Sequence, residues 1–336
     1  MMINTSIGLI GVAKQSAKAT AASTPSYVHG LTGGKTFNLD RTVENDDVSC
    51  GVRAGTDAHV ESIIPGADFD TYGYADVLPL YYYAAMGAIT SSANAGSGMT
   101  GYYDHVITLG DLLPYLTVWG RIGGEYTKVA GCKVDQIEME FEGNKPLEFG
   151  VTLLGLAATF GLESIPGNID PSCFSGYFVP TGGTFKIDTA SGTPAVAPVL
   201  GGNLTLANNC KADPLAGSVT PGDVEEGKLT SSGSVTVKPD DMTLYRKMVT
   251  GASDGTSPTG QMVYGSFEWN FTHSKDSKCT LKVQATNVPF TAEFPDVDPA
   301  GGAAEVEFSF DNIGLASRSG SPVTVTITND VASYSS

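Results

Sequence analysis

The sequence predicts a mainly β protein made of two tandem β-sandwich or partial-barrel modules, each with one short flanking helix. Gly contributes 41 of the 336 residues and charged side chains only 16%, a composition typical of short strands joined by turns. The length corresponds to two domains of roughly 150 residues. Hydrophobic residues make up 41% of the chain, enough to build packed cores.

The duplication is predicted from three sequence segments that occur twice in the same order. The first pair is a glycine turn leading into a strand that ends in Asp. The second pair is a short helix with Asp at its N-cap, apolar residues at helical spacing and Gly as its stop. The third pair is an alternating strand that begins with Phe. The matching segments are 33–40 with 182–188, 75–88 with 240–252, and 149–155 with 308–314.

The boundaries follow from these segments and from turn-forming residues. Residues 161–176 contain Pro166, Gly167 and Pro171 without hydrophobic periodicity, which predicts a linker. The segment 322–330 alternates Val and Ile with Thr, which indicates a last strand or an arm. We therefore predict an N-terminal arm (1–30), a first module (31–160), the linker (161–176), a second module (177–316) and a C-terminal strand or arm (317–336).

The net charge of −17 excludes several classes of partner. General adhesion to nucleic acid or to anionic membranes needs Lys and Arg to displace counterions. No run approaches the ~20 apolar residues of a membrane span. The lysines Lys14 and Lys18 follow the first apolar patch, the wrong order for a secretory signal. The five Cys are odd in number and far apart, which favours free thiols in a reducing cytosol over a disulfide scaffold.

The most informative local pattern is an alternation of apolar and acidic residues. Residues 137–142 read Ile-Glu-Met-Glu-Phe-Glu, so three carboxylates share one face of a strand, and a hairpin at Gly143-Asn144 repeats the pattern. Residues 290–294 and 305–311 alternate similarly. Two interpretations stay open: a solvated outer face, or a surface that repels a passing polyanion. The acids concerned are Glu138, Glu140, Glu142, Glu148, Glu293, Glu305, Glu307 and Asp311.

Catalytic, cofactor and metal sites are not expected. Residues 29–36 and 222–229 approach a phosphate-binding loop, but the first leads into a strand and the second lacks the Ser or Thr for Mg²⁺, so both are interpreted as turns. The pairs Asp104-His105 and His59 with Glu61 are interpreted as structural or surface residues. The paired acids Asp68 and Asp70, Asp240 and Asp241, and Asp296 and Asp298 are assigned to turns or helix caps.

A tyrosine cluster predicts contacts between subunits. Tyr81, Tyr82 and Tyr83 lie in the first predicted helix, without the basic neighbours that a base-stacking site needs. We expect that helix to bury one side on its sheet and to offer the other to a neighbouring copy. We expect Tyr245 in the second predicted helix to contact a neighbouring copy in the same way. Residues 6–26 are rich in Ala, Ser, Thr and Lys, and they are either a disordered tail or an arm that docks on another copy.

Taken together, the sequence resembles the major tail tube proteins of long-tailed, siphovirus-like bacteriophages, particularly the larger ones of phages that infect Gram-positive hosts. The resemblance spans nearly the whole chain. It rests on the small-residue segment 7–34, on Gly-Gly-Thr-Phe-Lys-Ile-Asp at 182–188, on Gly-Gly-Asn-Leu-Thr-Leu-Ala-Asn-Asn at 201–209 and on Ser-Ser-Gly-Ser-Val-Thr-Val at 231–237.

The resemblance implies that the modules join side by side into rings whose inner wall is a continuous β-barrel, and that rings stack into a conduit for DNA ejection. With two modules per chain, three chains would close a pseudo-sixfold ring, and a plain hexamer is the alternative. The acidic faces become candidates for the lumen, which DNA crosses without specific binding. Other implied partners are the tape measure protein and the tail terminator and tip proteins, with assembly in the host cytoplasm. The family pattern includes no catalytic residue.

Two rival functions were weighed against this one. A two-domain β-sandwich that binds carbohydrate or a cell surface would use exposed Tyr and Trp, but it would need a secretion signal, which we do not find. A hydrolase with a site scattered over loops is not excluded by composition.

Overall fold

The structure, a computed structural model of the whole chain, describes residues 4–45, 57–167, 169–190, 192–295, 302–315, 317 and 320–334. Strands make up 51% of the chain and helices 6%, arranged as two antiparallel sheets, which confirms the mainly β prediction. The first half contains β1 (Gly8–Lys14), β2 (Tyr27–Gly30), β3 (Gly33–Asn45), β4 (Ala58–Tyr72), α1 (Leu78–Met86), β5 (Gly87–Ala93), β6 (Tyr103–Leu109), β7 (Leu116–Ile122), β8 (Glu125–Glu142), β9 (Glu148–Leu154) and β10 (Ala157–Phe160).

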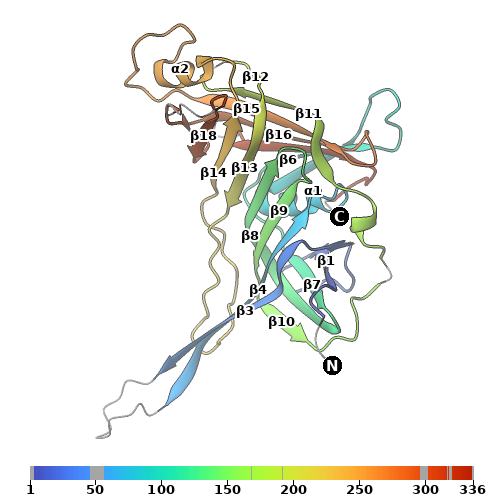
Figure 1. Cartoon of the computed structure of the whole chain (residues 1–336). Helices are drawn as coiled ribbons and strands as arrows, with labels where there is room; N and C mark the ends of the chain where they lie inside the picture. The colour runs from blue at the N-terminus through green and yellow to red at the C-terminus, as the bar shows by residue number, and fades with distance from the viewer. Residues whose placement is uncertain are drawn as a thin grey trace, which may run out of the picture.

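The second half begins after a short 3₁₀ helix, η1 (Ser172–Phe174), in the predicted linker (Figure 1). It contains β11 (Phe178–Asp188), β12 (Ala195–Val196), β13 (Val199–Ala207), β14 (Thr230–Val237), α2 (Thr243–Thr250), β15 (Gly265–His273), β16 (Thr280–Val288), β17 (Phe290–Thr291), β18 (Val306–Asp311) and β19 (Val323–Asn329). The predicted C-terminal strand is therefore confirmed as β19.

The larger sheet divides at the long strand β8. Residues 136–142 of β8 lie between β9 and β13, giving the strand order β3-β4-β9-β8-β13-β14-β18-β17. The first residues of β8 lie between β7 and β10, giving the order β10-β8-β7-β1-β2. The smaller sheet has the order β12-β11-β15-β16-β19-β6-β5. Both sheets therefore contain strands from both halves of the chain, joined where β8 pairs with β13 and where β19 pairs with β6.

The same strand orders occur in both halves. In the first half the order β3-β4-β9-β8 corresponds to β13-β14-β18-β17 in the second half. The order β2-β1-β7-β8-β10 corresponds to β12-β11-β15-β16-β19. The long strand β8 occurs in both series, and in the second half β16 and β17 together take its place. The helices α1 and α2 follow β4 and β14 in both cases. One predicted match is wrong: residues 33–40 lie in β3 and residues 182–188 in β11, which belong to different sheets and have different neighbours.

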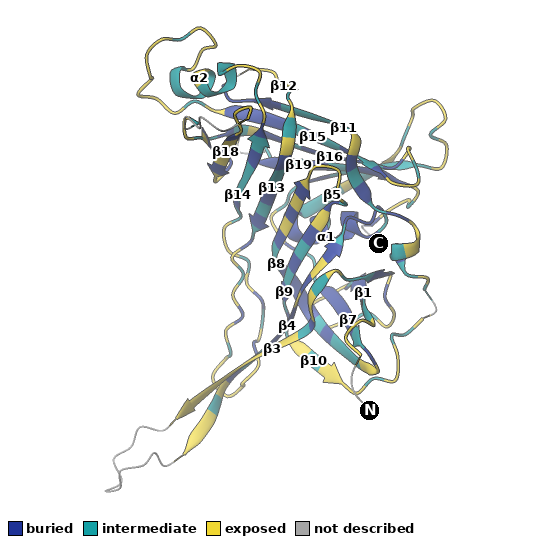
Figure 2. Cartoon of the chain, viewed as in Figure 1, coloured by how far each residue is buried: buried dark blue, intermediate teal, exposed yellow. Residues whose placement is uncertain are grey.

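The N-terminal segment is neither a tail nor a free arm over its first strand. Residues of β1 pair with β2 on one side and β7 on the other, and Ile10 and Val12 are fully buried. The reason is the apolar run Leu9 to Ala13, which supplies side chains for both faces of a covered strand. The hairpin of β3 and β4 extends away from the body, with most of β3 exposed (Figure 2).

The core lies between the two sheets and encloses α1 (Figure 2). Both helices end at a glycine in the left-handed conformation, Gly87 and Gly251, as predicted. The predicted Asp N-caps are wrong for α1, where Val77 is the N-cap and the Asp76 carboxylate instead accepts a hydrogen bond of 2.6 Å from the Ser172 hydroxyl. In α2 the N-cap is Met242, although the Asp241 carboxylate accepts a hydrogen bond from the Thr243 backbone N–H.

Two further expectations concern cysteines and membranes. Cys132, Cys173, Cys210 and Cys279 are free thiols, as predicted, and Cys50 lies outside the described residues. No helix in the described parts of the chain is long and apolar enough to cross a membrane.

Candidate functional site: an acidic sheet face and two free strand edges

The predicted acidic residues lie on the outer face of the larger sheet. Glu138, Glu140 and Glu142 alternate on β8 with the buried side chains Ile137, Met139 and Phe141, because successive residues of a strand point to opposite faces. The other members lie at the start of β9, on β18, or directly beside β17 and β18. All eight acids are exposed: Glu138, Glu140, Glu142, Glu148, Glu293, Glu305, Glu307 and Asp311.

Strand register places these acids in rows across the sheet. One row runs from Glu148 through Glu140 to Asn203, Ser234 and Ser309; a second from Glu138 through Thr205 and Ser232 to Asp311; a third from Glu142 through Gly201 and Thr236 to Glu307. The strands β13 and β14 thus place small or neutral polar residues between the acids of the two halves. Glu140 and Glu148 lie directly opposite each other, an arrangement that destabilises a sheet by a few tenths of a kcal/mol.

Two further acids belong to this face, Asp68 and Asp70. Sequence reasoning assigned them to a turn, which is wrong, because both are exposed residues within β4 and lie opposite Thr152 and Gly150 of β9. The Thr152 hydroxyl donates a hydrogen bond of 3.2 Å to Asp68. The signal that could have found them is the alternation of Ala67 and Phe69, both buried, with the two Asp residues.

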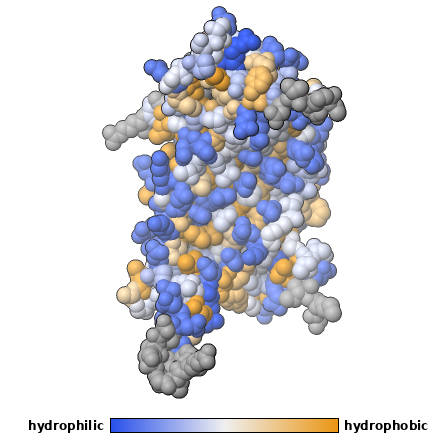
Figure 3. Space-filling model, turned by 60° about the vertical axis from the view of Figure 1, so that its left-hand side comes forward, coloured by the Kyte–Doolittle hydropathy of each residue, from blue (hydrophilic) through white to orange (hydrophobic). Residues whose placement is uncertain are grey.

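Two of the larger hollows of the molecule lie on the acidic face. One, of about 640 Å³, is lined by Glu140 and Glu142 of the first half together with Glu305 and Glu307 of the second. The other, of about 600 Å³, is lined by Glu293, Glu305 and Glu307. Within the described residues no group of His, Cys, Asp or Glu side chains is arranged to hold a metal ion. When the side that bears β14 and β18 is turned forward, hydrophilic side chains cover much of the middle of the molecule (Figure 3).

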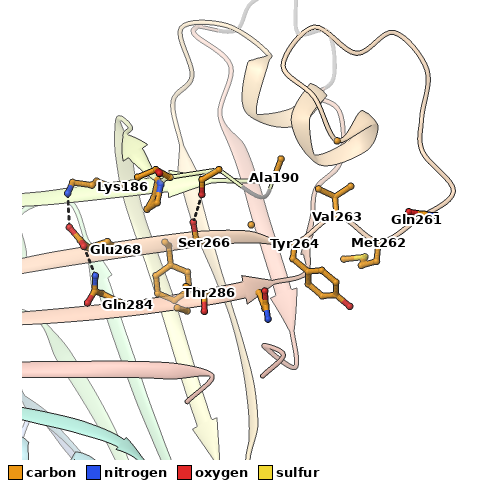
Figure 4. A pocket seen from close by; sticks show the side chains of 18 of the residues that line it. Lys186, Ala190, Gln261, Met262, Val263, Tyr264, Ser266, Glu268, Gln284 and Thr286 are labelled. Carbon is orange, nitrogen blue, oxygen red and sulfur yellow. Dashed lines mark hydrogen bonds and ion pairs between the residues drawn. The ribbon is translucent and has the colours of Figure 1, made fainter. Parts of the chain in front are cut away.

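A larger hollow, of about 870 Å³, lies beside the C-terminal end of α2 (Figure 4). On its floor the Lys186 ammonium contacts the Glu268 carboxylate at 2.7 Å, and Glu268 also accepts a hydrogen bond from the Gln284 amide. The Lys186 hydrogen bond holds the pKa of Glu268 below its usual value. Met262 and Tyr264 on the rim are exposed. This hollow offers apolar contact area over strands β11, β15 and β16 of the smaller sheet.

Two histidines, His29 and His105, are held by hydrogen bonds inside the fold. His29 is fully buried and its imidazole contacts the Tyr81 hydroxyl at 2.7 Å and the Gly30 carbonyl at 2.9 Å. Burial lowers the pKa of His29 to about 4. His105 contacts Ser91 and Asn329, whereas Asp104 accepts hydrogen bonds from Asn94 and Thr328, so that pair is not an acid–base pair.

The prediction that the tyrosines of the first helix contact a neighbouring copy is wrong for Tyr81 and Tyr82. Tyr81 and Tyr82 are each 1% exposed and pack inside the core, so their side chains are not available to a neighbouring copy. The reason is that α1 is apolar on every side and is covered by both sheets, a property of buried helices. Tyr83 is half-buried, with the Lys14 ammonium 5.7 Å from its ring centroid. Tyr245 is half-buried against the Phe294 ring, at 5.3 Å between centroids.

Two strand edges end the series of strands that carries the acidic face. Among the described strands, β3 pairs only with β4, and β17 pairs only with β18. Unpaired edges present rows of backbone N–H and C=O groups that can template pairing with another chain. The acidic face is thus bounded on both sides by strands with an open edge.

Comparison with known families agrees with this class of protein. Residues 4–328 match the family model described as phage tail tube protein. The chain therefore belongs to the phage tail tube protein family, which confirms the predicted resemblance to tail tube proteins and makes it a structural component of the virion tail. A search of curated proteins found no match.

Proposed function

We propose that this chain assembles with copies of itself into rings that stack as the tail tube, and that the acidic face lines the lumen through which DNA is ejected. The observation that carries this proposal is the series β3-β4-β9-β8-β13-β14-β18-β17, which has an acidic and polar outer face and an unpaired edge at each end. A closed ring removes both edges, which otherwise invite uncontrolled pairing.

The recurring strand orders support a duplicated tube module, with the first module in 31–160, the linker in 161–176 and the second module in 177–316. The contact of β8 with β13 is then a module junction inside one chain. Three chains with two modules each would make a pseudo-sixfold ring. A hexamer in which one module of each chain lines the lumen is the alternative stoichiometry.

An acidic lumen suits a conduit for DNA. Carboxylates repel phosphates, so DNA would pass a mainly acidic wall without being held. Asp68 and Asp70 extend the proposed lumen surface toward the β3 edge. As a tube subunit the chain would also contact the tape measure protein and the tail terminator and tip proteins, and it would assemble in the host cytoplasm.

Two measurements test the proposal. Electron microscopy of the purified protein should reveal hollow rings or tubes, with threefold end views for the duplicated arrangement and strict sixfold views for the hexamer. A chain that stays monomeric even with tail-tip components would contradict tube formation.

The lumen assignment has its own test, reversal of four acids of the face in the combined variant E138K/E140K/E305K/E307K. We expect tails that assemble but eject DNA at least several-fold more slowly, because lysines in the lumen would bind phosphates. A matched control reverses four exposed acids outside this face, Glu125, Glu163, Asp213 and Asp254, which should leave ejection unchanged. Normal ejection from assembled tails of the first variant would remove the lumen assignment.

A further inference from the structure

A pair of phenylalanines in matching places has very different surroundings. Phe141 follows Glu140 on β8, and Phe294 follows Glu293 just beyond β17. Glu140 lies opposite Glu148 of β9. The register of β17 with β18 pairs Thr291 with Ser309, and continuing it by two residues brings Glu293 opposite Glu307. Phe294 thus occupies in the second half the position that Phe141 occupies in the first.

Phe141 reaches across the junction between the halves. It is 3% exposed, and its ring contacts Phe185, Trp269 and Phe271 of the second half at 5.1, 5.1 and 5.2 Å between centroids. Phe294 is 62% exposed, and its ring contact is with Tyr245 of its own half. The equivalent side chain is therefore buried by the other half in one case and exposed in the other.

We propose that the edge formed by β17 and Phe294 docks on the β3 edge of a second copy of this chain, in the same register as β8 on β13. This inference rests on the proposed function and adds to it the contacting strands and residues. The occupant is a second copy because the surface that receives the matching β8 edge within the chain is the β13 edge, and β3 holds the place of β13 in the other half.

The register follows residue by residue. Asp70 lies 17 residues before Gly87, and Ser234 lies 17 residues before Gly251. Because the two glycines end the matching helices, Asp70 and Ser234 occupy corresponding positions. Asp70 pairs with Gly33 and Ser234 pairs with Asn203, so Gly33 corresponds to Asn203 and Lys35 to Thr205.

Inside the chain, Glu140 lies opposite Asn203 and Glu138 opposite Thr205. The transferred register therefore brings Gly33 of the second copy opposite Glu293, and Lys35 of the second copy opposite Thr291.

Charge and burial both favour this contact. Lys35 is an exposed cation on a mainly acidic face, and the register places it diagonal to Glu293, within reach of that carboxylate. Docking would also cover Phe294, whose side chain is 62% exposed in the single chain. The expected gain combines aromatic burial, backbone pairing of two open edges and an ion pair.

The first test is disulfide cross-linking of assembled protein that carries Lys35→Cys and Thr291→Cys together. We expect oxidation to link most chains into dimers and trimers on a non-reducing gel, with the single variants giving none. Asp40→Cys combined with Thr291→Cys is the matched off-register control, because Asp40 is exposed on the same strand five residues further on. Tubes that form without the 35–291 link, or that link 40 with 291 equally well, would overturn the register while leaving the tube function intact.

The second test is Phe294→Ala, with Phe174→Ala as a control at another highly exposed phenylalanine. We expect Phe294→Ala to raise the concentration needed for assembly at least tenfold while the thermal unfolding of the free chain stays unchanged. The control should leave the assembly concentration unaltered. Equal assembly of Phe294→Ala and the unmodified chain would contradict the docking role of this side chain. Absence of tubes from the unmodified chain would instead contradict the proposed function.

Discussion

The two helices occupy matching places in the two halves but differ in burial. Every residue of α1 except Tyr83 is buried, whereas α2 has no fully buried residue. Elements from the second half hold both ends of α1: the Asn208 amide donates to the Ala85 carbonyl, and the Tyr334 hydroxyl donates to the Asp76 carbonyl. In the structure α2 lies at one end of the molecule, beyond β15 and β18 (Figure 1). The difference teaches that elements of the second half help to bury the helix of the first half, whereas α2 stays partly exposed in the single chain.

The largest expected effect is the difference in stability lost when one tyrosine of each helix is replaced by Ala. Tyr82 of α1 contacts the Phe149 ring edge-on at 5.8 Å between centroids, and its hydroxyl donates to the Met139 sulfur at 3.5 Å. Replacing this buried ring by Ala should lower the free energy of unfolding by about 3–5 kcal/mol. The same change at Tyr245 of α2 should cost less than about 1 kcal/mol in the free chain, because that ring is half-exposed. Urea denaturation measures both, and similar losses would contradict the difference between the helices.

The helices also illustrate what the sequence could predict. Both helices were predicted, and Gly87 and Gly251 marked their ends correctly. Strand alternation identified the acidic faces of β8 and β18. These features are local, so a single segment contains their whole signal.

Other features could not be predicted from the sequence, because they depend on contacts between segments that are far apart in the chain. The pairing of β8 with β13 joins residues 59 to 71 positions apart, and no local pattern specifies it. Burial of Tyr81 and Tyr82 depends on which elements cover α1, so the sequence supported a surface role instead. Asp68 and Asp70 were assigned to a turn because Asp favours turns, although the strand register made them part of the acidic face.

A pH dependence of intermediate size is expected where α1 meets β2. His29 is fully buried and contacts Tyr81 of α1, and burial lowers its pKa from 6.5 to about 4. Between these values the unfolded chain binds a proton that the folded chain does not, so stability rises with pH across this window. Acidification from pH 6.5 to 4 should therefore cost about 3 kcal/mol from this residue alone.

Chemical denaturation at a series of pH values tests this expectation. His29→Gln should flatten the stability profile between pH 6.5 and 4, because the variant has no imidazole to protonate at this position. His59→Gln, at an exposed residue of β4, is the matched control and should leave the profile unchanged. If the free energy of unfolding of His29→Gln falls with acidification as steeply as that of the unmodified chain, the acid sensitivity arises at other groups.

The smallest effect compares the glycines that end the two helices. Both have positive φ, +89° at Gly87 and +77° at Gly251, where a non-glycine residue costs roughly 1–2 kcal/mol. A Cβ at Gly87 would lie 2.7 Å from the Leu112 carbonyl oxygen, which is backbone and cannot swing away, whereas at Gly251 its nearest neighbour is a Val263 methyl at 3.5 Å. Gly251→Ala should thus cost about 1 kcal/mol, the backbone strain alone. Gly87→Ala should cost more, because the crowding around α1 adds to the same strain.

A third glycine, Gly98, gives the cost of the backbone strain alone. Gly98 has φ +78°, and a Cβ added there would have no atom within 4 Å. Thermal unfolding of Gly87→Ala, Gly251→Ala and Gly98→Ala should therefore rank the first as the least stable, with the other two close together. Equal losses at Gly87 and Gly251 would mean that the surroundings of α1 yield as readily as those of α2. The contrast in burial between the two helices would then not extend to their ends.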